Sequence, residues 1–256
     1  MTNKIIVGTR DSKLALTQTQ KVIQRLNSLY PHIKFEVLKI KTKGDILQDH
    51  PIESSIDKGF FVKEIQEMLL KKKIDVAIHS LKDLPVDPIP GLEVSAVIER
   101  DDPRDALVLN SKIEFNDDLN NLTISTSSNR RSSQLLKLYP KIKMKTIRGN
   151  VDSRIKKMEK GYCDGIVISA AALIRLGLQN KITHTFDMDE MICAPGQGTI
   201  ALEIRDEDKT IQKIISSVNH LETSICVNVE RSFLKKLEGG CTAPIGAYAK
   251  LENGKV

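Results

Sequence analysis

Apolar positions along the chain follow two alternating patterns, one typical of buried strands and one typical of amphipathic helices. Short apolar runs occur at residues 4–9, 34–40, 74–80, 92–98, 122–127, 144–149, 164–169, 199–205 and 245–251. Segments whose apolar residues recur three or four positions apart occur at 13–29, 57–69, 130–139, 151–160, 170–178, 209–218 and 221–237. Strands that alternate with helices in this way indicate an α/β fold with mostly parallel sheets.

The strand and helix pattern runs through two similar halves before the chain enters a shorter third part. ERDDPRDA (99–106) divides the two halves, and APGQG (194–198) ends the second. We therefore expect two similar open-sheet lobes and a small third α/β domain. The expected boundaries are 1–98 with 199–217 for the first lobe, 104–194 for the second and 220–256 for the third domain. This two-lobed plan resembles that of periplasmic solute-binding proteins.

The basic charge of the chain raises nucleic-acid binding as a possible function. The formal net charge is +6, but the chain has only 4 Tyr, 6 Phe and no Trp, so it is poorly supplied with aromatic rings on which bases could stack. The lysine cluster at 71–73 ends a predicted helix, where cations suit the helix dipole. We expect no nucleic-acid partner, and no membrane partner because no apolar run is long enough to span a bilayer. Met1 to Lys4 leads directly into a predicted strand without a secretory pattern, so we expect a cytoplasmic protein.

The four cysteines do not form a metal-binding pattern. None of Cys163, Cys193, Cys226 and Cys241 belongs to a CxxC pair, so we expect no metal site. The first three lie in or near apolar segments, as buried cysteines commonly do. Cys241 differs, because it lies in GGCTAPIG (239–246), a turn that follows the glycines ending a predicted helix.

Hydroxyl and cationic side chains follow four of the predicted strands. They are Arg10 and Ser12; Ser80 and Lys82, which the acid Asp83 follows; Thr126, Ser127, Ser128, Arg130 and Arg131; and Arg148 with Arg154. Ligands of open α/β sheets bind beyond the carboxyl ends of the strands, where helix N-termini favour anions. Arginine binds carboxylates and phosphates through two parallel hydrogen bonds. The recurrence at strand ends predicts a ligand with several negative groups, and the absence of Walker and GxGxxG motifs disfavours a nucleotide.

Individual residues in this set also have simpler interpretations. Asp83 is either a turn-former before Pro85 or a group that exchanges protons and stabilises a cation. His79, on a predicted buried strand, is expected to be a core histidine rather than a catalyst. Any single arginine, taken alone, is expected to form an ion pair at the surface.

Ten segments, in order and over nearly the whole chain, resemble the porphobilinogen deaminase (hydroxymethylbilane synthase) family. They are TRDSKLALTQ (9–18), KGFFVKEI (58–65), DVAIHSLKDLP (75–85), ERDDPRDA (99–106), STSSNRR (125–131), IRGNVDSR (147–154), AALIRLGL (171–178), PGQG (195–198), ERSFLKKLEGGC (230–241) and PIGAY (244–248). Any one segment is a weak signal, whereas the ordered set is specific.

The resemblance implies a transferase that joins four porphobilinogen molecules head to tail, releasing ammonia each time, to give hydroxymethylbilane for haem biosynthesis. It implies a dipyrromethane cofactor linked by a thioether to Cys241, and Asp83 as the catalytic residue that stabilises cationic pyrroles and moves protons. It also implies a set of residues that bind the carboxylates of cofactor and substrate: Arg10, Ser12, Lys58, Ser80, Lys82, Thr126, Ser127, Ser128, Arg130, Arg131, Arg148, Arg154 and Arg175. We expect the enzyme to work as a monomer.

Two departures from the family pattern leave alternatives open. The family usually continues well beyond PIGAY, whereas this chain ends at LENGKV, so we expect a third domain that is truncated or naturally short. The segment PIESSIDKG (51–59) has Ser54 and Ser55 where the family often has a further lysine, although Lys58 remains. The alternative functions are an anion-binding protein of the solute-binding type and a truncated, inactive form of the enzyme.

Overall fold

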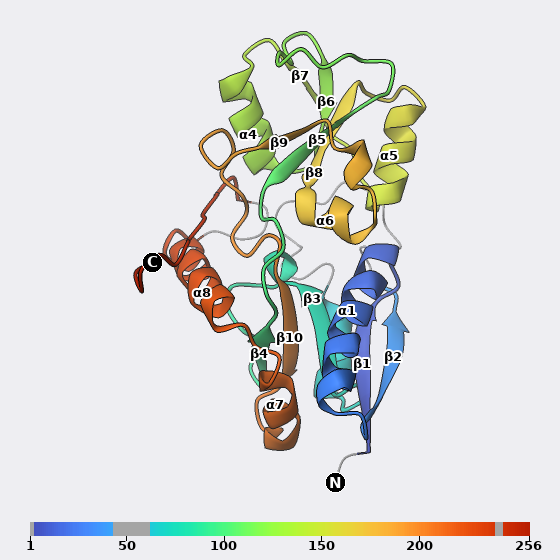
Figure 1. Cartoon of the computed structure of the whole chain (residues 1–256), viewed down its shortest axis with the longest axis vertical. Coiled ribbons are helices and arrows are strands. Elements are labelled where there is room, and N and C mark those ends of the chain that lie inside the picture. Colours follow the sequence, from blue (N-terminus) through green and yellow to red (C-terminus); the bar gives the residue numbers. More distant parts are fainter. Residues whose placement is uncertain (1–2, 43–61, 239–242) are drawn as a thin grey trace.

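A computed structural model describes residues 3–42, 62–238 and 243–256 of the chain (Figure 1). The described residues form two five-stranded mixed sheets, one above the other in Figure 1, with helices on both faces of each. Each sheet with its helices is called a lobe below. Lys58 and Cys241 lie outside the described residues.

The first lobe is built on a sheet with strand order β2-β1-β3-β10-β4. Its strands are β1 (Lys4–Arg10), β2 (Lys34–Ile40), β3 (Val76–Ser80), β4 (Leu92–Val97) and β10 (Ile200–Arg205), and its helices are α1 (Lys13–Leu29), α3 (Lys63–Leu70) and α7 (Lys209–Ser216). Strand β1 is parallel to β2 and β3, whereas β10 is antiparallel to β3 and β4. The sheet is mixed because β10 enters it last, after the chain returns from the second lobe.

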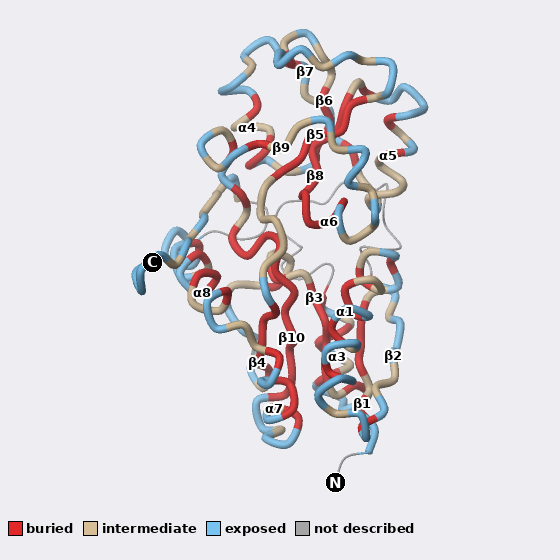
Figure 2. Tube along the Cα trace, in the orientation of Figure 1, coloured by how far each residue is buried: buried red, intermediate tan, exposed pale blue. Residues whose placement is uncertain are grey.

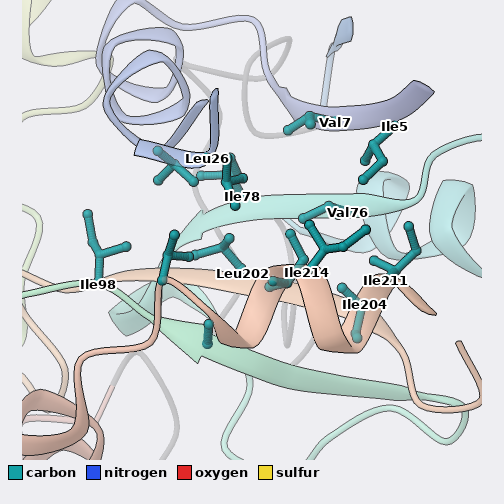
Figure 3. Close-up of a cluster of buried hydrophobic side chains, with 14 of the residues drawn as sticks. Ile5, Val7, Leu26, Val76, Ile78, Ile98, Leu202, Ile204, Ile211 and Ile214 are labelled. Atoms are coloured by element: carbon teal, nitrogen blue, oxygen red, sulfur yellow. The ribbon is translucent and has the colours of Figure 1, made fainter. Parts of the chain in front are cut away.

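Alternation of side chains along the strands divides the core of the first lobe between two faces. Val76 and Ile78 point to one face, where they pack with Leu26 of α1 and Ile211 of α7 (Figure 3). Ala77, between them, points to the other face and packs with α3. Period-two alternation in the sequence thus determines which helices cover which face.

The second lobe repeats this plan with strand order β7-β6-β8-β5-β9. Its strands are β5 (Asp105–Leu109), β6 (Thr123–Ser125), β7 (Lys143–Lys145), β8 (Gly165–Ser169) and β9 (His184–Phe186), and its helices are α4 (Asn129–Leu138), α5 (Val151–Glu159) and α6 (Ala170–Arg175). Helices α5 and α6 contribute to the apolar cluster on one face, and α4 contributes to the cluster on the other.

The chain passes between the lobes twice, in two crossing segments at residues 98–104 and 187–199. The segments are hydrogen-bonded to each other, because the backbone N–H of Asp101 donates to the carbonyl of Gly198 at 3.0 Å. Helix α8 (Leu221–Lys236) follows α7 and packs beside β4, and buried residues run continuously from β10 into the second crossing segment (Figure 2). Two short 3-10 turns complete the fold, η1 (Leu81–Asp83) after β3 and η2 (Gln179–Lys181) before β9.

The α/β class and the positions of most elements are confirmed, but two predicted strands differ from the structure and two strands were not predicted. The strand expected at 144–149 ends at Lys145, because the chain turns through Gly149 with φ of 110°. Residues 245–251 form no strand, and the last described residues contain only an isolated bridge between Glu252 and Lys255. Strands β5 and β9 lie where no strand was expected.

Helix α8 buries a different face from the one that its apolar residues predict. Val229, Phe233 and Leu237 recur every four residues, yet they are 46%, 48% and 52% exposed. The buried face contains Glu230 instead, which is 1% exposed. The same face buries Cys226, Val227 and Leu234, and the Glu230 carboxylate forms an ion pair with Arg100 of the first crossing segment at 2.6 Å.

Candidate functional site

The turn η1 carries Lys82 and Asp83 at the carboxyl end of β3, on the side of the first lobe that faces the second. Leu81 and Leu84 flank them and are buried, so the turn is fixed from below while both polar side chains remain partly exposed. Arg231 of α8 donates to the carbonyls of Leu84 at 3.2 Å and Pro85 at 2.6 Å. The position of Asp83 is therefore set by the sheet on one side and by α8 on the other.

In the second lobe, two arginines at the start of α4 share one buried carboxylate. Arg130 and Arg131 each lie 2.7 Å from an oxygen of Asp105, which is 0% exposed at the start of β5. The hydroxyl of Ser128 caps α4 by accepting from the backbone N–H of Arg131, so the helix start holds both arginines toward the sheet. Two guanidinium groups against one carboxylate leave this buried group with a net positive charge.

The charge state of Asp105 depends on these arginines. Burial alone would raise the pKa of Asp105, but the guanidinium groups of Arg131 and Arg130 lower it far below its usual range. Burial in turn lowers the pKa of Arg131, and the charge of Arg130 adds to this effect. The three groups therefore form an interdependent ion cluster.

Three further cations extend the positive charge around Asp83, and the pKa values of two of them are lowered. Burial and the charge of Arg131 lower the pKa of Lys82 to about 8. Burial and the charge of Arg131 also lower the pKa of Arg154 to about 10, with a further contribution from Arg148, while Asp83 acts in the opposite direction. Asp83 of the first lobe thus interacts electrostatically with Arg154 of the second.

We call Lys82, Arg130, Arg131, Arg148 and Arg154 the cationic cluster. Among the residues that the structure describes, the charges of Asp83 and Asp105 act on this cluster of five cations. A ligand with several carboxylates would relieve the unfavourable proximity of these cations. The donor chemistry of the cluster therefore fits a dipyrromethane group that carries acetate and propionate side chains.

Several of the predicted hydroxyl groups lie at helix starts or beside the cluster. Ser12 caps α1 by accepting from the backbone N–H of Ala15 at 3.3 Å. Ser80 interacts with Gln18 of α1 at 3.0 Å. Thr126 accepts from the backbone N–H of Ser128 at 3.2 Å. Ser127, the residue between these two, is exposed, and Arg10 is partly buried at the end of β1.

Arg175 makes contacts unlike those of the cationic cluster. Its guanidinium lies 2.7 Å from a carboxylate oxygen of Asp101 and donates to the carbonyl of Gly198 at 2.6 Å. Burial lowers the pKa of Arg175, and Asp101 opposes this shift. These partners tie α6 to both crossing segments through an ion pair that is partly buried rather than exposed at the surface.

Sequence reasoning assigned no role to four polar residues that connect the lobes and α8. They are Arg100, Asp105, Gln197 and Glu230, all of which occur in the motifs quoted above. Besides its pair with Arg100, Glu230 accepts from the backbone N–H groups of Gly196 at 2.7 Å and Ala249 at 2.9 Å. In the sequence, the charged residues of a turn-rich segment such as ERDDPRDA look like those of a solvent-exposed loop. Only their partners far along the chain show that such residues are buried and connect the lobes.

Within the residues that the structure describes, no helix is long and apolar enough to cross a bilayer. The same residues contain no group of His, Cys, Asp and Glu side chains that could hold a metal ion.

Two mixed α/β sheets joined by two crossing segments, with a cationic cluster where they meet, define a two-lobed protein suited to a polyanionic ligand. The chain belongs to the porphobilinogen deaminase family. Residues 5–213 match the family model described as the dipyrromethane cofactor binding domain of porphobilinogen deaminase, and residues 224–256 match its C-terminal domain.

Similar proteins support the same assignment. The chain is 41% identical over 256 residues to porphobilinogen deaminase of Carboxydothermus hydrogenoformans, covering 100% of this chain and 82% of that protein. It is 44% identical over 253 residues to porphobilinogen deaminase of Clostridioides difficile, covering 98% of this chain and 84% of that protein. Among solved structures, a probable amino-acid ABC transporter extracellular-binding protein from Bacillus subtilis has a TM-score of 0.50 at 13% identity, covering 92% of this chain and 97% of that one. That likeness concerns the two-lobed fold alone.

The predicted family, enzyme class and cofactor are therefore confirmed. The chain is a transferase of tetrapyrrole biosynthesis, a hydroxymethylbilane synthase that uses porphobilinogen and contains a dipyrromethane cofactor binding domain.

Proposed function

We propose that the residues around η1 and the cationic cluster carry out the head-to-tail condensation of porphobilinogen, with Asp83 as the catalytic residue. The observation that carries this proposal is the position of Asp83, beside Lys82 in its own lobe and near enough to Arg154 of the second lobe for its charge to raise the pKa of both. A substrate held between the lobes would meet one carboxylate surrounded by cations. This arrangement suits a reaction in which negatively charged side chains must be held while positive charge develops on the ring.

Carboxylate binding is the proposed role of the cations and hydroxyl groups. Arginine forks pair with carboxylates bidentately, and helix starts supply further donors. The proposed binding residues are Arg10, Ser12, Lys58, Ser80, Lys82, Thr126, Ser127, Ser128, Arg130, Arg131, Arg148, Arg154 and Arg175. Because Arg130 and Arg131 already share Asp105 and also donate to the carbonyls of Ile192 and Val167, they would bind a ligand through their remaining N–H groups. Arg175 would act by holding the crossing segments.

When bound, the dipyrromethane cofactor supplies the pyrrole α-carbon on which the product chain grows. Cys241 is its proposed attachment point, through a thioether. The residues of the chain then hold successive pyrroles in order by their carboxylates, so that each new ring is presented in the same orientation.

Asp83 has two proposed tasks on each added ring. Departure of ammonia leaves positive charge on the pyrrole, and the Asp83 carboxylate stabilises that charge from a fixed position. After the new carbon–carbon bond forms, Asp83 accepts the proton that the α-carbon loses. Lys82 and Arg154 keep this carboxylate oriented between substrate carboxylates on either side.

We further propose that the protein is a cytoplasmic monomer without a nucleic-acid partner, with domains at 1–98 plus 199–217, 104–194 and 220–256. The cysteines of the described residues are unpaired, which suits a reducing compartment.

Replacement of Cys241 by serine is expected to abolish covalent cofactor attachment while the chain still folds. A serine oxygen is a poor substitute for a thiolate nucleophile, so the thioether cannot form. Intact mass spectrometry of the purified variant should give the bare sequence mass. Cys163→Ala is the matched control, because Cys163 is buried behind α5 and should leave the loaded mass unchanged apart from the substitution. A loaded Cys241→Ser chain would show that another residue is the attachment point.

A further inference from the structure

Gln197 is a fully buried amide that contacts both lobes. It lies in the second crossing segment and is 0% exposed. Its side-chain oxygen is 3.2 Å from the Nζ of Lys82 in the first lobe and 3.4 Å from the Nη2 of Arg131 in the second. Its side-chain nitrogen donates to Asp105 Oδ1 at 2.8 Å and to the carbonyl of Pro103 at 2.7 Å. One side chain thus joins η1, β5, α4 and the first crossing segment.

The chemistry of these partners permits only one orientation of the amide. Lys82 and Arg131 can only donate, so they require the amide oxygen. The Asp105 carboxylate and the Pro103 carbonyl can only accept, so they require the amide nitrogen. A flipped amide would place like groups against each other at all four contacts. No other uncharged side chain of this length offers both an acceptor and two donors.

The backbone around Gln197 is held as tightly as its side chain. Gly196 and Gly198, on either side, have φ of 72° and 85°, in the left-handed region that favours glycine. A Cβ on Gly198 would lie 2.5 Å from the carbonyl oxygen of Asp101. The carbonyl of Gln197 itself accepts from Nε of Arg100 at 2.9 Å. The segment therefore passes close to η1 and the first crossing segment and has little freedom to place the amide elsewhere.

We infer that Gln197 is a positioning residue that holds Lys82 of the first lobe in register with the Arg131–Asp105 pair of the second. Without the amide, Lys82 and Arg131 lose the neutral acceptor that they share, and nothing from Gln197 offsets their mutual repulsion. The two halves of the carboxylate-binding site then lose their fixed spacing. This inference rests on the proposed carboxylate-binding role of Lys82 and Arg131, and it goes further by naming the group that couples them.

Gln197→Met and Gln197→Glu test the inference together. Methionine is nearly isosteric but removes both the acceptor and the donors. Glutamate keeps acceptors for Lys82 and Arg131 but sets a second carboxylate against Asp105. Gln212→Met is the matched control, because Gln212 donates to Glu93 at 2.8 Å between α7 and β4, away from the cluster.

We expect both Gln197 variants to lower the rate of porphobilinogen addition by about tenfold or more, since misplacement of binding groups is costly to reaction rates. Gln212→Met should retain the wild-type rate. The second readout is the pH dependence of Lys82 acylation, followed by peptide mass spectrometry on cofactor-free protein. The wild-type pH midpoint of Lys82 acylation should lie near the lowered pKa of about 8. The midpoint should be lower in Gln197→Met, because this variant removes an acceptor from the charged amine, and higher in Gln197→Glu, because this variant adds negative charge.

A purely structural role would lower the thermal stability of both variants without moving the Lys82 midpoints in opposite directions, and that result overturns the inference. Wild-type addition rates in Gln197→Met also overturn it. Lys82→Met, measured in parallel, distinguishes the proposed carboxylate-binding role of Lys82 from the positioning role of Gln197. If Lys82→Met impairs cofactor loading and Gln197→Met does not affect loading, rate or midpoint, the inference fails and the proposed function stands. If Lys82→Met loads and reacts normally, both fail.

Discussion

Asp83→Ala is expected to lower the rate of hydroxymethylbilane formation by about 10²–10⁴-fold, the range typical of a lost general acid or base. The cofactor should still be attached, because its proposed attachment point is Cys241 and the proposed binding groups for its carboxylates are cations. The effect should fall on chemistry rather than on folding, since Asp83 is partly exposed on a turn that Leu81 and Leu84 anchor. Rapid-quench measurement of each pyrrole addition, with intact mass for cofactor loading, checks both parts.

The same loop provides a control for this substitution. Asp87 is an exposed carboxylate that pairs with Lys235 of α8 at 2.8 Å, so Asp87→Ala removes equal charge nearby without touching the cationic cluster. It should react at the wild-type rate, because an exposed ion pair contributes little. Near-normal turnover by Asp83→Ala, or equal losses in the two variants, would rule out the catalytic assignment.

Asp105→Ala should be the most destabilising single substitution at the site, by about 3–5 kcal/mol, because it leaves two buried guanidinium groups without their carboxylate. At about 2–4 °C per kcal/mol for a chain of this size, the melting temperature should fall by roughly 6–20 °C. Cofactor loading should also decrease, since Arg130 and Arg131 would lose their fixed positions. Thermal unfolding and intact mass measure the two effects.

The pH dependence of stability offers an independent check on Asp105. Its pKa is lowered in the folded state, so its contribution is complete above the ordinary carboxylate pKa of about 4 and is lost progressively as the pH falls from there through the lower folded value. The wild-type chain should therefore begin to lose this contribution in moderate acid and lose all of it only in stronger acid. The difference in the free energy of unfolding between wild type and Asp105→Ala should be constant from pH 5 to 8 and should shrink below that range.

Asp102→Ala is the appropriate comparison for Asp105→Ala. Asp102 pairs with Arg104 at 2.9 Å in the same motif, but both side chains reach solvent, so the expected loss is about 0–1 kcal/mol. Equal destabilisation by the two substitutions would contradict the view that Asp105 is the structural centre of the second half of the site.

The parts of the fold that the sequence predicted are those that local pattern controls. Helices α1, α4 and α7 begin and end close to their expected limits because Ser12, Ser128 and Asp208 cap their starts. The buried strands β3 and β8 were recognisable because they are continuous apolar runs. Polar residues directly follow several predicted strands in the sequence. The location of the candidate site at the carboxyl ends of strands could therefore be predicted from the order of strands and polar residues along the chain.

The parts that local pattern could not predict depend on partners far along the chain. Strand β5 starts at Asp105, a charged residue that is buried only because two arginines 25 and 26 positions later pair with it. Glu230 is buried in α8, where Arg100, far from it in sequence, provides its counter-charge. Gln197 connects the lobes through atoms that belong to four different elements. Each of these is a buried polar residue, and its sequence neighbours do not reveal its partner.

The central claim is that this chain is a cofactor-bearing polymerising enzyme rather than an anion-binding protein of similar fold. The most direct measurement is the intact mass of the purified wild-type chain before and after brief exposure to porphobilinogen. The predicted spectrum shows the sequence mass plus a dipyrromethane before exposure, and further peaks spaced by one pyrrole unit afterwards. The bare sequence mass in both samples would contradict the claim.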